Sequence, residues 1–222
     1  LLLFGLIYSG RGGSQSGSFD ATAPGILIGA ALFFSCLSGP VMLLVTEREH
    51  GTLRRLLLSP LSPLAYFLGV VLAFACIGLM QALIVYGIAA IFGGRFHGNL
   101  AMGTLILALS IISYVGLGFF FGTRFARRTQ DVNGPVSAFG VPMLVLGGTF
   151  FPVSLLPDYL LMAAHFNPVL HMNRALGQVS AHAAGLTDIG WNVAYLAVFA
   201  LLSLGMGVRA YGQLLQIERG KH

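Results

Sequence analysis

Charge is scarce in this chain of 222 residues. Charged residues make up 9% of it, and lysine occurs once, at Lys221. A typical soluble domain carries roughly 25% charged residues, so this chain lacks the side chains needed to build a water-soluble surface. Because 56% of its residues are hydrophobic, we expect an integral membrane protein.

Several catalytic and ligand-binding patterns are also missing. A phosphate-binding loop needs a lysine after a glycine-rich stretch, and Lys221 has no such context, so the chain is not expected to hydrolyse ATP itself. No zinc pattern is present, and a structural role is expected for His165, His171 and His182. The expected spans carry no ionisable residue at mid-depth, which disfavours a proton-driven pump. Cys36 and Cys76 lie in apolar runs and are expected to be buried rather than joined.

Uncharged runs of helical length recur along the chain. A membrane span needs about 20 apolar residues, and the opening run LLLFGLIY is interpreted as the end of a truncated first span. Five further spans are expected at residues 24–45, 66–92, 102–122, 135–151 and 189–208, the fifth kinked at Pro142. The sequence therefore predicts an all-α polytopic membrane protein with six spans, forming one domain over residues 1–222.

The basic residues set the orientation of these spans. Alternate loops hold nine of them: Arg48, Arg54, Arg55, Arg124, Arg127, Arg128, Arg209, Arg219 and Lys221. The opposite loops hold three: Arg11, Arg95 and Arg174. Cytoplasmic loops carry the excess of basic residues, so we expect a cytoplasmic C-terminus. The net charge of +5 then needs no nucleic-acid partner.

Residues 151–185 fit neither a span nor an ordinary loop. They contain three prolines, at Pro152, Pro157 and Pro168, and two short apolar stretches at 158–166 and 169–179. Helices this short cannot cross a bilayer and suit a re-entrant or interfacial position. We expect a short helical pair on the outer face, before the last span.

The loop at residues 46–63 concentrates charge between two apolar segments. Thr46 and Glu49 have the spacing of a capping box, which predicts a helix restarting at Thr46, and a continuous helix through Glu49 fits as well. Neither Glu47 nor Glu49 has an arginine three or four positions away, so each carboxylate must find water or a partner elsewhere. Pro60 and Pro63 then end any helix.

The order of these features resembles a known family. A span opening with PGI is followed by EREHGTLRRLLLSPLSP, and GGTFFPVSLLPDYL with FNP precedes the last span. This arrangement is similar, over essentially the whole chain, to the membrane permease subunit of type-2 ABC transporters. That class includes exporters of drugs, polysaccharides and lipid-linked glycans.

The resemblance implies a dimer, with a second permease copy that is identical or different, in the inner (plasma) membrane among its lipids. ATP and magnesium would bind to a partner ABC ATPase, and this chain would hold no cofactor or metal. The ATPase would couple to the loop between the second and third spans through Glu47, Arg48, Glu49, Gly51, Thr52, Leu53, Arg54, Arg55 and Pro60. The outer lid of the substrate path would include Phe151, Pro152, Pro157, Asn167 and Pro168.

Two alternatives stay open from the sequence. The charged loop could serve only to anchor the topology, and the chain could be a membrane scaffold or assembly protein that transports nothing. The polar residues within spans are also ambiguous, because they suit helix–helix hydrogen bonds or a path for an amphipathic, drug-like or lipid-like cargo. The residues in question are Ser35, Ser38, Gln81, Ser113 and Thr149.

Overall fold

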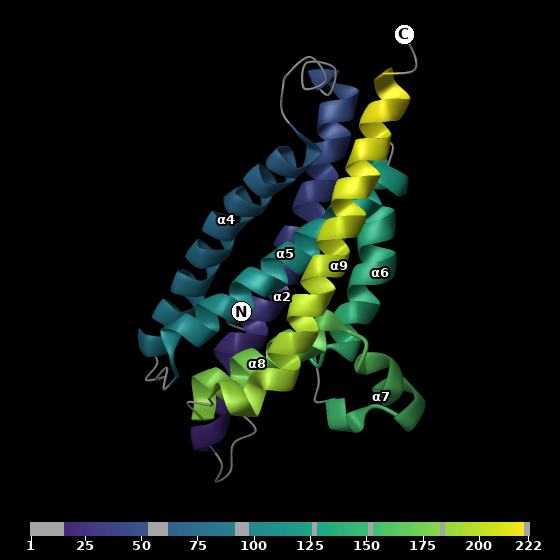
Figure 1. Ribbon diagram of the computed structural model, residues 1–222. Helices are drawn as coiled ribbons and strands as arrows, with labels where there is room; N and C mark the ends of the chain where they lie inside the picture. Colours follow the sequence, from purple (N-terminus) through teal and green to yellow (C-terminus); the bar gives the residue numbers. More distant parts are fainter. Residues whose placement is uncertain are drawn as a thin grey trace.

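The computed structural model describes residues 16–52, 62–91, 98–125, 128–150, 153–182 and 185–219. Every regular element in these ranges is helical, which confirms the all-α prediction. Long helices form a bundle, α8 lies across one end of it, and α7 protrudes beside α8 (Figure 1).

Among the described residues, four helices are long and apolar enough to cross a membrane. They are α2 (Ser16–Glu49), α4 (Pro63–Ile91), α5 (Leu100–Arg124) and α9 (Leu186–Arg219). All four were expected, although α9 continues eleven residues beyond the predicted end at 208. Tyr211 and Leu214 are buried in this extension, so packing against the bundle sustains the helix after its apolar run has ended.

The fifth predicted span is shorter than expected. Its helix, α6 (Asn133–Leu146), contains Pro142 and has 14 residues, which at about 1.5 Å per residue is about 21 Å. It ends before Gly147 and Gly148, and Gly148 has a φ of +73°, a conformation that glycine adopts far more readily than other residues. The count of six spans therefore stays a prediction.

Residues 153–182 form the predicted pair of short helices. A 3₁₀ turn, η2 (Val153–Leu155), leads into α7 (Asp158–Ala164) and then α8 (Pro168–His182). Four large apolar side chains of this segment are more than 70% exposed: Leu155, Tyr159, Met162 and Phe166. In α8, by contrast, most of the side chains that the structure describes are buried.

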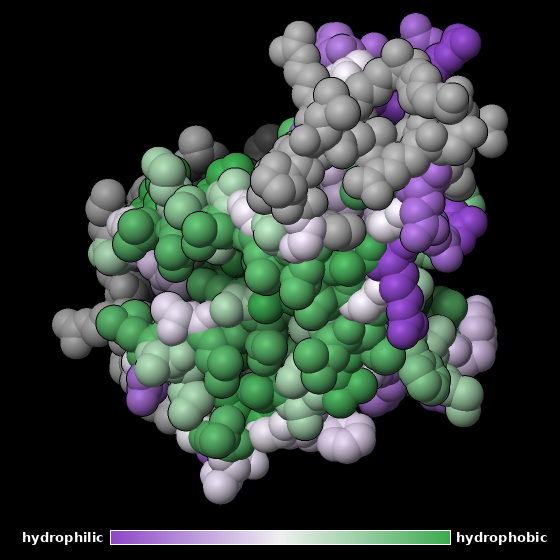
Figure 2. All heavy atoms as spheres, turned by 45° about the horizontal axis from the view of Figure 1, so that its top comes forward, coloured by the Kyte–Doolittle hydropathy of each residue, from purple (hydrophilic) through white to green (hydrophobic). Residues whose placement is uncertain are grey.

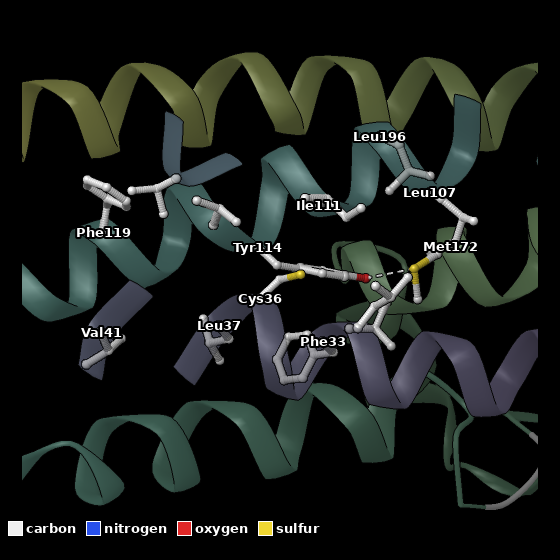
Figure 3. Packing of buried hydrophobic residues seen from close by; sticks show 14 of the residues in the cluster. Phe33, Cys36, Leu37, Val41, Leu107, Ile111, Tyr114, Phe119, Met172 and Leu196 are labelled. Atoms are coloured by element: carbon white, nitrogen blue, oxygen red, sulfur yellow. Dashed lines mark hydrogen bonds between the residues drawn. The ribbon is translucent and has the colours of Figure 1, made fainter. Parts of the chain in front are cut away.

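The core lies where α2, α5, α8 and α9 meet. Tyr114 of α5 is fully buried, and its hydroxyl donates to Met172 Sδ of α8 at 3.4 Å (Figure 3). Its ring meets Phe33 of α2 edge-on at 5.1 Å. Where α5 crosses α9, a Cβ on Gly116 would lie 2.6 Å from the backbone of Ser203, so glycine permits the two helices to pack closely.

The flanks of the bundle are apolar and exposed. Leu72 and Leu83 of α4 are 67% and 73% exposed, and hydrophobic side chains cover much of the flank seen in Figure 2. Cys36 is buried as expected, whereas Cys76 was wrongly expected to be buried and lies exposed on α4. Such a surface suits contact with lipid rather than water.

Candidate functional site

Helix α2 runs without a break into the charged sequence and ends at Glu49. The amide of His50 donates to the Thr46 carbonyl at 2.9 Å, and the amide of Gly51 donates to the Arg48 carbonyl at 3.3 Å. Gly51 has a φ of +68°, the left-handed conformation that commonly ends a helix. The structure therefore selects the continuous helix, and the alternative of a helix restarting at Thr46 was wrong.

Glu47 holds the start of the next long helix. Its carboxylate accepts a hydrogen bond from the Tyr66 hydroxyl at 2.6 Å, and Tyr66 lies in the first turn of α4. The ring of Tyr66 stacks on Tyr211 of α9 at 4.8 Å and 14°, and it meets Phe119 of α5 edge-on at 6.0 Å. One carboxylate thus links α2 directly to α4 and, through the rings, to α5 and α9.

Glu49 holds a different element. Its carboxylate accepts from the Thr129 amide at 3.1 Å and also from the Thr129 hydroxyl. Thr129 begins η1 (Thr129–Asp131), the 3₁₀ turn in the connection between α5 and α6. Hydrogen bonds to a carboxylate are among the stronger ones in proteins, so the end of α2 is joined here to a connection 80 residues away in sequence.

Arg48, between the two glutamates, reaches a third element. Its Nη2 donates to the Gly122 carbonyl in the last turns of α5 at 3.4 Å. We call Glu47, Arg48 and Glu49, together with Tyr66 and Thr129, the α2 junction. Three consecutive residues at the end of α2 therefore bind α4, α5 and the α5–α6 connection.

The partners of the two glutamates could not be read from the sequence. The glutamates were expected to lack intrahelical ion pairs, and the structure supplies neutral hydroxyl and amide donors instead. The one signal in the sequence that could have pointed to these partners was hydropathy, which places Tyr66 and Thr129 near the same membrane boundary as the end of α2. Gly51 and Thr52 are exposed beyond the junction. Four other expected coupling residues lie outside the described residues: Leu53, Arg54, Arg55 and Pro60.

At the opposite end, Asn167 fixes the start of α8. Its Oδ1 accepts from the Val169 amide at 3.0 Å, and its Nδ2 donates to the Met143 carbonyl of α6 at 2.5 Å. Pro168 occupies the first position of α8, where a missing amide hydrogen costs least, and Pro157 precedes α7. Phe151 and Pro152, also expected in the lid, lie outside the described residues.

His171 connects the two short helices to α9. Its Nδ1 lies 2.8 Å from Asn192 Oδ1, and its Nε2 lies 2.9 Å from the His165 carbonyl. Its ring stacks on Tyr195 at 3.9 Å, and the Tyr195 hydroxyl donates to the Phe166 carbonyl at 2.6 Å. These contacts agree with the structural role expected for His171. Within the described ranges, no three His, Cys, Asp or Glu side chains are grouped to hold a metal.

The five possible path residues do not form one group. Ser35 Oγ lies 3.3 Å from Gln81 Oε1, which joins α2 to α4. Ser38 and Ser113 each donate to a carbonyl of their own helix. Thr149 accepts from Asn173 of α8 at 3.2 Å. These bonds lie within one helix or join neighbouring parts of the chain, and a role in a path stays a prediction.

A chain of long apolar helices with charged residues gathered at the end of α2 defines a polytopic membrane protein. Residues 1–179 match the ABC-2 type transporter family, and the chain belongs to this family. The membership confirms the resemblance that the sequence motifs indicated.

Three curated relatives agree with this assignment. The chain is 32% identical over 147 residues to the probable multidrug ABC transporter permease YbhR of Escherichia coli, covering 66% of this chain and 39% of that protein. It is 25% identical over 185 residues to the linearmycin resistance permease protein LnrN of Bacillus subtilis, covering 82% and 48%. The inner membrane transport permease YhhJ of E. coli is 28% identical over 120 residues, covering 52% and 31%. The matched part is thus less than half the length of each relative.

Proposed function

We propose that this chain is the membrane-spanning permease part of an ATP-driven ABC exporter. The observation that carries the proposal is the α2 junction, in which Glu47 binds α4 and Glu49 binds the α5–α6 connection. A partner that pushes on the end of α2 would therefore move several helices together. A loop that only anchored the topology would not need these bonds.

In this account, the ATPase docks on the segment that follows α2. Gly51 and Thr52 begin that segment, and the family resemblance adds Leu53, Arg54, Arg55 and Pro60. The two glutamates hold the base of the segment from inside the chain. Glu47 and Glu49 would thus serve the coupling by organising the loop, through their bonds to Tyr66 and Thr129.

The remaining parts of the proposal follow from the family and the sequence. The partner ATPase would bind ATP and magnesium, and a second permease copy, identical or different, would complete the path. The chain would lie in the inner membrane, and the distribution of its basic residues favours a C-terminus on the cytoplasmic side. The names of YbhR and LnrN refer to multidrug transport and linearmycin resistance, and the weakly polar spans agree with an amphipathic, drug-like or lipid-linked cargo moving outward.

The test is reconstitution with an ABC ATPase encoded beside the gene. We expect the two chains to copurify, and inside-out vesicles containing both to accumulate an amphipathic fluorescent dye when ATP is added. Vesicles whose ATPase carries a substitution of its phosphate-loop lysine are the control. A chain that does not bind the ATPase, or vesicles that behave like the control, would favour the scaffold alternative.

A further inference from the structure

A groove lies between the first turn of α4 and the second half of α9. It has a volume of about 470 Å³, and its walls are Leu64 of α4 and the stretch of α9 from Leu201 to Arg209. Volumes of about 300–1,000 Å³ are usual for small-molecule sites. The groove is separate from the α2 junction and from the five possible path residues.

The residues of α9 are spaced to make an elongated site. Leu201, Gly205 and Arg209 are four positions apart, so they form one row along the helix. With a rise of about 1.5 Å per residue, the row is about 12 Å long. Gly205 leaves the middle open, because among the described residues no atom lies within 4 Å of a Cβ built there.

The two ends of this row differ in chemistry. Apolar side chains form the groove except at Arg209, which is exposed and has no hydrogen-bond or ion-pair partner in the part of the chain that the structure describes. Arg209 lies half a turn before Tyr211, so it is close to the level of the α2 junction. Leu201, at the other end, is 69% exposed on a flank of apolar side chains.

The surroundings of the groove identify its occupant. It lies between α4 and α9, two candidate membrane spans, and a groove between spans is within reach of lipids in a bilayer. Hydrophilic residues gather toward one end of the molecule, while apolar ones cover its flank (Figure 2). A ligand that matches both an apolar wall and a terminal guanidinium carries a hydrocarbon chain and an anionic head. Basic sites between spans near the membrane surface bind anionic lipid headgroups.

We propose that this groove is a binding site for an anionic phospholipid. One acyl chain lies along α9 over Gly205, and the phosphate bonds to the Arg209 guanidinium. The site needs no particular cargo and no ATPase, so it stands apart from the exporter function. By the distribution of arginines, the bound lipid belongs to the cytoplasmic leaflet.

The experiment is a native mass spectrometry titration of the purified protein with phosphatidylglycerol and phosphatidylcholine of identical acyl chains. One basic residue near the membrane surface contributes about 1 kcal/mol, so we expect phosphatidylglycerol to bind about fivefold more tightly. Arg209→Gln should make the two lipids equal, and Gly205→Leu should weaken the binding of both by filling the groove.

Two matched variants control for general effects. Arg128→Gln removes another exposed cation outside the groove, and Gly212→Leu adds a side chain to α9 at a second open glycine. Both should keep the fivefold preference. Three results would overturn the proposal. The first is a preference for phosphatidylglycerol that survives Arg209→Gln, and the second is competition by glycerol phosphate, which has no acyl chain, as strong as that by the lipid. The third is a Gly205→Leu variant that binds lipid normally and loses only its association with a second copy of the chain.

Discussion

The hydrogen bond between Tyr66 and Glu47 can be removed with little other change. Tyr66→Phe deletes the hydroxyl that donates to Glu47 at 2.6 Å and keeps the ring that stacks on Tyr211. A hydrogen bond to a charged group contributes about 1.5–3 kcal/mol. Because Glu47 is only half-buried, water replaces part of the bond, and we expect a loss near the lower limit of about 1.5 kcal/mol.

The assay is the free energy of unfolding, measured by titrating the purified protein with SDS in mixed micelles. A double-mutant cycle with Glu47→Ala isolates the pair, and residues in contact typically couple by about 0.5–3 kcal/mol. The control is Tyr159→Phe, at a tyrosine that is 74% exposed, where a change within about 0.5 kcal/mol is expected. If Tyr66→Phe is equally silent, or if the two substitutions are additive, the bond does not stabilise the junction.

Three further predictions concern packing, capping and topology. Gly116→Ala should lower the free energy of unfolding by about 1–3 kcal/mol, because its Cβ would overlap α9. Gly212→Ala should leave the free energy of unfolding unchanged, and equal effects of the two substitutions would contradict the close packing of α5 on α9. Asn167→Ala should cost about 1 kcal/mol through the lost cap of α8, measured by the same titration, and an unchanged value would contradict that role. In a background without native cysteines, impermeant reagents added outside should label cysteines introduced at Gly17 and Gly185, and should not label cysteines introduced at Gly51 and Gln130. The reverse labelling pattern would overturn the orientation.

Much of the fold could be predicted because its signals are local. Apolar runs of helical length identified the four long helices, and prolines marked the two short ones, so that α7 ends only two residues from its predicted end at 166. Where α6 and α9 end was less predictable. Helix α6 ends before Gly147 and Gly148, and the packing of Tyr211 prolongs α9 past its apolar run. Hydropathy reports neither of these helix ends.

The α2 junction was predicted only in part for the same reason. The sequence singled out Glu47 and Glu49 as carboxylates in need of partners. It could not name Tyr66 or Thr129, because hydropathy gives the depth of a residue in the membrane and not the direction in which its helix faces. That direction is set by how the helices cross, and hence by packing among residues far apart in the chain.

The central claim is that the α2 junction couples ATP hydrolysis to the movement of the membrane helices. The most direct measurement is the rate of cargo-stimulated ATP hydrolysis and export by the assembled complex carrying Glu47→Ala and Glu49→Ala. We expect the chain to insert normally and both rates to fall several-fold, whereas Arg127→Gln, in the next basic loop of the sequence, should have a smaller effect. A double variant that binds its ATPase and exports at the normal rate would contradict the account and leave the charged loop as a topological anchor.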